Sequence, residues 1–262
     1  MNLLMIIVLL LLVIIAVLVY RWYIAKIKII VNEWDSNDIK DIEPVTTKKL
    51  DLGDSTNYTF SIWIYMTKWN VSSKPKYLIQ RLDSEDVTQT GIVDMKTASD
   101  ADKKSVLYHL ELGDTNNDLT CMVQYDTKDS TASTTVHAFA KCKVEKIPIQ
   151  RWVNVITTIR NRFIDMYIDG KLYKHCIMEN PANTSKKSAI IVLGTKETGD
   201  KHYLNGRVSK LEYIDDFITP QKAWDIYVSG PRSMSIWGTF LNRYMLRIQW
   251  LKDGKVKKKF EI

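Results

Sequence analysis

A long series of short segments with two-residue periodicity constrains the fold of this chain more than any other feature. It begins with the apolar segment YTFSIWIYM at 58–66, ends with VSKLEYI at 208–214, and is punctuated by polar clusters such as 83–90. Many short strands separated by turn signals indicate an antiparallel sandwich, so we predict an all-β fold. The other expected strands are 76–81, 106–112, 119–125, 136–144, 152–160, 163–169, 172–178 and 189–195.

Two local motifs refine this prediction. Asp169-Gly170 lies between two expected strands, and an Asp-Gly pair there is typical of a tight hairpin that needs positive φ. Thr219-Pro220 has the form of a helix N-cap followed by proline at the first helical position. The helix should run to Gly230-Pro231, with Ala223, Trp224 and Tyr227 as its packed stripe.

The N-terminus carries an uninterrupted apolar run from Leu3 to Tyr20. A helix of that length extends ~27 Å, close to the roughly 30 Å hydrocarbon core of a bilayer. A soluble helix would show a polar face, and a cleaved signal peptide would need a basic start and a small-x-small site. We therefore predict a retained transmembrane anchor, marked by Leu3, Ile7, Leu11, Ile15, Val19, Tyr20 and Trp22.

The charges after this run predict its orientation. Arg21, Lys26 and Lys28 follow the run, and no acid occurs before Glu33. Such cations collect on the cytoplasmic flank of a span and attract anionic headgroups, although the α-amino group of Met1 adds a competing charge. We predict a single-pass protein with its large domain on the cytosolic side. N-glycosylation sequons there would go unmodified at Asn57, Asn70 and Asn183.

Charge and cysteine content narrow the class further. Of the net charge of +7, residues 21–31 contribute +3 and residues 232–262 contribute +6, which leaves −2 for 32–231. Because a nucleic-acid-binding face is more often built into the domain itself, we expect no nucleic-acid partner. The three cysteines form an odd, sparse set without a CxxC motif, which argues against a disulfide framework and for a reducing compartment. They are Cys121, Cys142 and Cys176.

We divide the chain into an anchor with a basic juxtamembrane segment (1–31), a polar stalk (32–50), a sandwich (51–231) and a basic extension (232–262). The extension has two interpretations. Residues 246–250 alternate, Asp253-Gly254 supplies a turn, and the alternation then resumes to Ile262, which favours a short helix followed by a hairpin. One long helix over 233–251 is the alternative.

Several of these segments together resemble a known superfamily. The aromatic strand FSIWIYM, the pair RWVNVITTIR and FIDMYIDGKLY, and the closing pattern NGRVSKLEYIDDFITPQKAWDIYVSG resemble the concanavalin A-like, laminin-G-like jelly rolls over roughly residues 45–231. The resemblance implies a jelly-roll sandwich with a short helix after its last strand. It also implies structural roles for Trp63, Trp152, Asp169, Gly170, Gly206 and Trp224.

The whole layout resembles membrane-anchored minor capsid proteins of large double-stranded DNA viruses, such as the algal chloroviruses. That resemblance implies a structural protein that tethers an icosahedral shell to an internal membrane. Its partners would be the bilayer, the major capsid protein and other minor components, and it would lie between membrane and shell. A membrane-anchored carbohydrate-binding module is the alternative, with carbohydrate as the ligand.

We predict no enzyme activity, no catalytic residues and no cofactor. Retaining glycosidases of this superfamily need two carboxylates about 5–5.5 Å apart. The nearest candidates, Glu111 with Asp114 and Glu212 with Asp215 and Asp216, lack the E-x-D-x-x-E spacing. The four histidines are far apart and lack metal-ligand spacing.

Three other groups are weaker candidates for binding. The turn with Asp114, Asn116 and Asp118 offers oxygens that suit calcium, although a plain solvated turn accounts for it better. Trp69 is a candidate for stacking on a sugar or a protein. The basic run suits an acidic partner or lipid, and equally suits protection of an edge strand; it comprises Lys257, Lys258 and Lys259.

Overall fold

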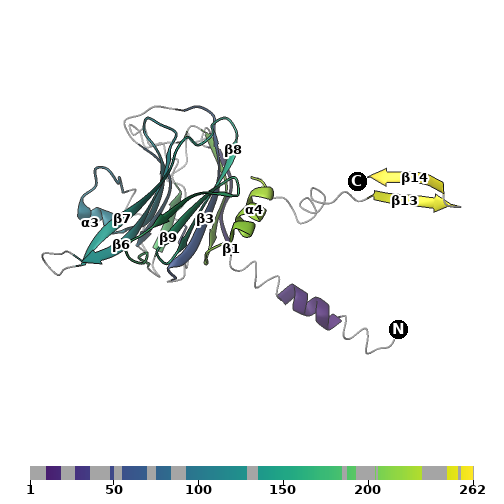
Figure 1. Cartoon of the computed structure of the whole chain (residues 1–262), viewed down its shortest axis with the longest axis horizontal. Helices are drawn as coiled ribbons and strands as arrows, with labels where there is room; N and C mark the ends of the chain where they lie inside the picture. The colour runs from purple at the N-terminus through teal and green to yellow at the C-terminus, as the bar shows by residue number, and fades with distance from the viewer. Residues whose placement is uncertain are drawn as a thin grey trace.

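The protein is described here by a computed structural model. It describes residues 10–18, 27–35, 48–49, 55–69, 75–83, 93–128, 135–184, 188–192, 204, 206–231, 247–252 and 255–261. Most of these residues build two antiparallel sheets that lie face to face (Figure 1). The predicted all-β sandwich is confirmed.

Within the described residues each sheet has six strands. Sheet A has the order β1 (Ile27–Asp35), β12 (Gly206–Ile214), β3 (Asn57–Met66), β8 (Trp152–Arg160), β9 (Phe163–Ile168) and β10 (Lys171–Ile177). Sheet B has the order β2 (Lys48–Lys49), β11 (Ser188–Val192), β4 (Lys76–Asp83), β5 (Val106–Leu112), β6 (Leu119–Lys128) and β7 (Thr135–Val144).

The core lies between the sheets, and the alternation in β3 explains why. Tyr58, Phe60, Ile62, Ile64 and Met66 all point into it and are at most 1% exposed. One ring neighbour comes from the opposite sheet, where Tyr108 of β5 stacks on Phe60 with ring centroids 4.6 Å apart, and another is Tyr213 of β12 in the same sheet. Arg81 of β4 is fully buried among them, with its guanidinium 4.8 Å from the Tyr58 ring centroid, a cation–π arrangement.

A short helix, α4 (Pro220–Val228), covers part of the outer face of sheet A (Figure 1). Thr219 accepts a hydrogen bond from the Lys222 amide, Pro220 occupies the first helical position, and Gly230 takes a positive φ of 77° after the helix. These predicted boundaries are confirmed. The packed stripe was only partly right, because Ala223 and Ile226 are the buried residues and Trp224 is 41% exposed.

The outer face of sheet B is covered by the segment 93–104, which includes the short helix α3 (Asp100–Lys103). Gln80 of β4 fixes this segment by bonding both backbone groups of Val93, since its amide nitrogen donates to the carbonyl oxygen and its carbonyl accepts the amide. Tyr77 and Leu82 pack with Val93 in a separate apolar cluster. The helix α3 was not predicted from the sequence, because it is only four residues long.

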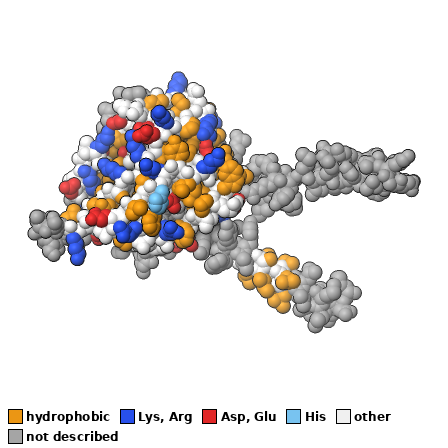
Figure 2. All heavy atoms as spheres, in the orientation of Figure 1, with side chains coloured by type: hydrophobic (Ala, Val, Ile, Leu, Met, Phe, Trp, Pro, Cys, Tyr) orange, Lys and Arg blue, Asp and Glu red, His pale blue; other side chains and the backbone are white. Residues whose placement is uncertain are grey.

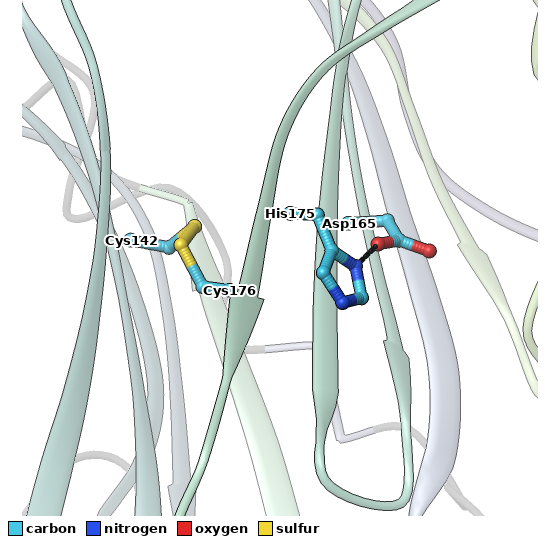
Figure 3. Close-up of a disulfide and its surroundings, with 4 residues drawn as sticks. All are labelled: Cys142, Asp165, His175 and Cys176. Atoms are coloured by element: carbon cyan, nitrogen blue, oxygen red, sulfur yellow. Dashed lines mark hydrogen bonds and ion pairs between the residues drawn. A yellow bond between two sulfur atoms is a disulfide. The ribbon is translucent and has the colours of Figure 1, made fainter.

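A disulfide joins the two sheets at one edge, contrary to our interpretation of the cysteines. Cys142 on β7 and Cys176 on β10 are bonded, with Cα atoms 5.9 Å apart (Figure 3). The residues are 34 positions apart in sequence, and only the packing of β7 of sheet B beside β10 of sheet A brings them together. Cys121 is a buried free thiol directly across from Cys142 on the neighbouring strand β6, and burial raises its pKa to about 12.

β1 corrects the predicted domain boundary. Residues 27–35 were assigned to the juxtamembrane segment and the stalk, but they form an edge strand whose Ile27 lies opposite Ile214 of β12. The predicted juxtamembrane cation Lys28 is therefore part of sheet A. The local pattern did not reveal this strand, because the partner that the described residues give it, β12, lies at the other end of the sandwich sequence.

The terminal hairpin is confirmed in preference to one long helix. β13 (Arg247–Lys252) pairs with β14 (Lys255–Glu261), and Trp250 lies opposite Lys258. The short helix predicted before this hairpin lies outside the described residues, as does the stalk apart from 32–35 and 48–49.

Residues 10–18 form a helix in which the side chains are all apolar and all exposed. Hydrophobic side chains cover it in Figure 2. Leu11 and Ile15 are described within it, whereas the other predicted anchor residues lie outside the described part. Among the helices of the described residues, none has both the length and the apolar character that crossing a membrane requires.

Candidate binding cleft beside helix α4

A cleft of about 510 Å³ opens beside α4 at one end of the sandwich. Three segments enclose it: the loop after β7, the turn between β9 and β10, and the exposed side of α4. Its lining combines aromatic rings with charged groups, among them Glu145, Lys146, Arg151, Asp169, Lys171, Tyr173, Trp224 and Tyr227. A concave site with aromatic walls and a few polar groups is the usual form of a small-ligand site.

The β9–β10 turn forms one wall because its two residues accept left-handed backbone geometry. Asp169 has φ 51° and Gly170 has φ 74°, the pattern of a type I′ hairpin. The predicted Asp-Gly hairpin is therefore confirmed. Gly170 is also required for packing, since a Cβ atom there would lie 2.9 Å from the Tyr227 Cβ and 3.1 Å from the Trp224 Cα.

The Asp169 carboxylate organises the polar side of the cleft. Its Oδ1 accepts the amide hydrogen of Asn154 at 3.0 Å, and its Oδ2 accepts a hydrogen bond from Arg151 at 2.6 Å. The Arg151 side chain is about half exposed, whereas Asp169 is 16% exposed. The carboxylate thus holds a half-exposed guanidinium at the mouth of the cleft, and Nη1 of Arg151 also donates to the Trp152 carbonyl at 3.4 Å.

Aromatic rings line the opposite side. Trp63 of β3 stacks on Tyr227 with centroids 5.8 Å apart and an interplanar angle of 16°, and Trp224 follows at 5.4 Å from Tyr227. Trp63 is buried and Trp224 is 41% exposed. Tyr173, which lies on the edge strand β10, is 61% exposed. The series of rings therefore runs from the outer face of sheet A to the solvent.

The side chain of Lys210 binds the residues that follow the C-terminus of α4. It has φ 49° at a bulge in β12, and its ammonium donates to the Ser229 hydroxyl at 2.7 Å and the Gly230 carbonyl at 3.2 Å. A cation suits the carbonyl end of a helix. Burial lowers the pKa of Lys210, an effect that neighbouring Glu212 opposes.

Comparison with known proteins assigns the family. The laminin-G-type model of the concanavalin A-like lectin/glucanases superfamily matches residues 43–222. This chain belongs to that superfamily. The match runs from β2 to the first residues of α4 and leaves out only β1 of the two sheets, so the lectin-like fold that the sequence motifs resemble is confirmed.

No curated protein matches the chain. Among solved structures, it is similar to the receptor-binding domain of a botulinum neurotoxin C/D mosaic serotype, with 12% identity and a TM-score of 0.43 over 66% of this chain and 36% of that one. The receptor-binding domain of botulinum neurotoxin D gives 11% identity and a TM-score of 0.43 over 72% of this chain and 40% of that one. The chain thus spans well under half of these structures.

A second hollow, of about 320 Å³, lies on the outer face of sheet B and contains the predicted calcium candidates. Asp114 accepts a hydrogen bond from Lys96 at 2.5 Å, and this bond lowers the pKa of Asp114 to about 2. Lys143 lies 2.7 Å from Asp118 and lowers its pKa in the same way. Both carboxylates are thus paired with lysine ammonium groups. Asn116 lines the same hollow. Among the described residues no group of three metal-ligating side chains occurs.

Of the two glutamates considered for glycosidase chemistry, Glu111 has a partner on its own strand. Glu111 lies 3.0 Å from Nε2 of His109, and Nδ1 of that histidine lies 3.4 Å from the Gln80 amide nitrogen. His109 is fully buried, so the imidazole is held by a partner on each side. Glu212 lies on the other sheet, where burial raises its pKa.

The remaining predicted residues have structural positions. Trp152 is half-buried and packs on Tyr65, with ring centroids 5.7 Å apart. Gly206 leaves no room for a side chain, since a Cβ atom would lie 1.9 Å from the Tyr65 carbonyl oxygen. Trp69, predicted as an exposed partner contact, is partly buried and donates to the Thr115 carbonyl at 3.0 Å. The predicted basic run, Lys257, Lys258 and Lys259, lies on β14, and its side chains are outside the described residues.

Sequence reasoning missed the cleft itself, although it named Trp224 and Asp169. Arg151 and Tyr173 are ordinary residues in the sequence, and only the folded arrangement places them with Trp224. One available signal was the position of Trp224 on a short helix beside a predicted tight turn.

Proposed function

We propose that this protein is a membrane-anchored binding module that holds a macromolecular partner at a bilayer and has no catalytic role. The observation that carries this proposal is the helix at 10–18, where every side chain is apolar and exposed around the whole circumference. A helix that is hydrophobic on all sides needs an apolar environment such as a membrane interior. The full apolar run from Leu3 to Tyr20 has the length that a span requires.

The binding end would be the lectin-like sandwich, with the cleft beside α4 as its candidate contact. Exposed Trp224 and Tyr173 offer flat apolar surfaces, and Arg151 offers N–H donors that Asp169 holds in place. Aromatic residues and arginine dominate the energetics of protein recognition sites. The cleft therefore suits a partner that inserts a side chain or a short loop.

For the biological setting, we propose a minor capsid component of a large double-stranded DNA virus, which ties the outer shell to an internal membrane. The layout of anchor, jelly roll and basic hairpin supports this setting. The Cys142–Cys176 disulfide is compatible with it, because released particles lie in an oxidising medium whereas the cytosol is reducing. The domain would face the cytosol during assembly and close its disulfide once particles leave the cell.

The test of anchoring is flotation of the full chain with liposomes. Leu11→Arg with Ile15→Arg places two charges in the span, at a cost of roughly 3 kcal/mol for each at a bilayer centre, and should move the chain from the floating to the soluble fraction. Leu172→Arg is the matched control, since Leu172 is an exposed apolar residue of β10. Equal flotation of the double variant and the wild type would contradict the proposal.

The viral setting has a separate test. Purified particles should contain the chain in the fraction that stays with the internal membrane after the shell is stripped, and alkylation should find Cys142 and Cys176 protected there but reactive in freshly made chain. Glycan attached to Asn57 or Asn183 would instead place the domain in a lumen, where assembly from the cytosolic side is excluded.

Carbohydrate recognition is the second candidate function, and the cleft favours it specifically. Sugars stack on exposed aromatic rings, which Trp224 supplies beside the Arg151–Asp169 pair. Glycan-array binding by the full chain in detergent should be lost in Trp224→Ala and kept in Val228→Ala, an exposed apolar change on the same helix. Binding that survives Trp224→Ala would remove the cleft from consideration as a sugar site.

A further inference from the structure

The end of sheet A at which β1 begins carries a surface that matches a bilayer interface. Strand register identifies this end: Ile27 lies opposite Ile214, Asn57 opposite Arg160, Arg160 opposite Phe163, and Phe163 opposite Ile177. Because all the strands of the sheet are antiparallel neighbours, these pairs mark one and the same rim. We define the near rim as Arg160, Arg162, Phe163, Ile177 and Phe217.

The length of the connection to the anchor limits how far this rim can lie from the membrane. Only seven Cα steps separate Tyr20, the last residue of the predicted span, from Ile27 at the start of β1. Even a fully extended chain covers at most about 25 Å over that distance. The nine-residue strand β1 then carries the chain roughly another 26 Å toward the opposite rim. In a chain held by that span, the near rim would therefore be the end of the sandwich nearer the bilayer.

The near rim has the composition of an interfacial surface. Ile177 is 64% exposed and Phe217 is 39% exposed, so two apolar side chains project from it. The Arg160 guanidinium lies 5.5 Å from the Phe163 ring centroid and 5.4 Å from that of Phe217. A cation that rests on aromatic rings presents charge to headgroups while its apolar neighbours reach the acyl boundary.

The charges around the near rim are mixed. Arg160 and Arg162 supply two cations, and the Arg162 Nε donates to the Met178 carbonyl at 3.1 Å. Acids adjoin them: Glu179 is exposed, Asp215 accepts the Tyr213 hydroxyl hydrogen at 3.2 Å, and Asp216 accepts the Phe217 amide hydrogen at 2.8 Å. Such a surface complements a zwitterionic headgroup layer, which carries both charges, more closely than a strongly anionic one.

We propose that the near rim lies against the headgroup layer of the same bilayer that holds the anchor, and so fixes the orientation of the sandwich on the membrane. This inference rests on the proposed anchoring function. The α4 cleft is built around Arg151 and the β9–β10 turn, at the opposite end of sheet A. The orientation therefore points the cleft away from the membrane and toward a partner.

The experiment compares two positions at opposite ends of the sandwich in the full chain. Phe217→Cys and Ile149→Cys replace apolar residues that are both 39% exposed, and the Gln150 amide beside Ile149 bonds to the Met66 carbonyl at the far end of β3. Each is labelled with an environment-sensitive dye, while buried Cys121 stays unlabelled. The chain is reconstituted in phosphatidylcholine vesicles that contain a headgroup nitroxide quencher.

We expect several-fold stronger quenching at position 217 than at position 149. Equal quenching in vesicles that still float with the chain would overturn the near-rim proposal and leave anchoring intact. Failure to float would overturn both. Shielding of the label at 217 without lipid quenching would place a second copy or another protein on the near rim, and would also overturn the proposal.

Amide hydrogen exchange of unlabelled chains provides a second measurement that needs no substitution in the sandwich. Amide hydrogen exchange at 160–163 should slow in vesicles relative to the Leu11→Arg, Ile15→Arg chain in solution, while exchange at 146–150 should not change. Equal slowing of both segments, or of neither, would contradict an oriented sandwich.

Discussion

The outer faces of the two sheets are covered by different chemistry. On sheet A, α4 seals an apolar cluster that includes Ile156, Tyr167, Ala223 and Ile226, and it leaves an aromatic cleft at its side. On sheet B, the segment 93–104 is held by hydrogen bonds from the buried Gln80 and by the contact between Lys96 and Asp114, and Lys143 pairs with Asp118 in the same hollow. Apolar burial does not titrate, whereas carboxylate pairs do. The two faces should therefore fail under different conditions.

The disulfide is the covalent link between the two sheets, and its removal should have the largest effect. Closing a loop of 34 residues is worth about 4 kcal/mol in the chain-entropy description. We expect a reductant to lower the unfolding free energy of the wild type by about that amount in urea titrations. Cys142→Ala with Cys176→Ala should start from the lower value and be insensitive to reductant.

Cys121→Ala is the matched control for the disulfide experiment. Cys121 lies opposite Cys142 but remains a free, buried thiol, so this variant should keep the full response to reductant. A wild type that reductant does not destabilise would show that the two sheets depend on packing alone.

The apolar seal of sheet A should be the next most sensitive feature. Ile226→Ala removes a side chain that is 7% exposed from the cluster under α4, and a large-to-small change in such a site costs about 3 kcal/mol. Urea unfolding measures this loss, with Val228→Ala as an exposed control on the same helix. If both variants lose the same free energy, α4 contributes little to the stability of sheet A.

A change in the tight turn that contacts α4 should have the next largest effect on stability. Gly170→Ala forces a side chain into positive φ, at a cost of about 1–2 kcal/mol, and it also presses a methyl group toward Trp224 and Tyr227. We expect lower stability together with a change in tryptophan fluorescence, because the ring series of the cleft must shift. Lys174→Ala, an exposed position of β10 outside the cleft lining, should leave the fluorescence unchanged. An unchanged spectrum in Gly170→Ala would mean that α4 does not depend on close contact with the turn.

These results separate what local sequence encodes from what the fold adds. The strands from β3 to β12 were predictable because the alternation of apolar and polar residues shows which face of a strand is buried. The Asp169-Gly170 turn was predictable because only a few residue pairs tolerate its backbone geometry. β1 and the Cys142–Cys176 bond were not, since each depends on partners distant in sequence. The cleft was also missed, because the residues that line it come together only in the fold. The side of α4 that packs on sheet A carries Ala223 and Ile226, which leaves Trp224 partly exposed to solvent.

The smallest effects concern pH, and they should have opposite signs on the two faces. Lys143 lowers the pKa of Asp118 in the native state, so this pair stabilises the fold above the ordinary aspartate pKa near 4 and loses its contribution as pH falls through the lowered value. Burial raises the pKa of Glu212, so its contribution is fully present below the ordinary glutamate pKa and is lost as pH rises through the raised value.

Two variants isolate these contributions. Asp118→Asn should flatten the loss of stability in acid, and Glu212→Gln should flatten the loss that begins above about pH 4.5, each measured by urea unfolding at several pH values. The Asp118 effect should be the smaller, because Lys143 is half exposed and water screens the pair. Opposite slopes that vanish one at a time would establish that sheet A buries Glu212 in its neutral form, whereas Asp118 of sheet B stays ionised in its pair with Lys143. Parallel slopes in both variants would show that the two faces titrate as one unit.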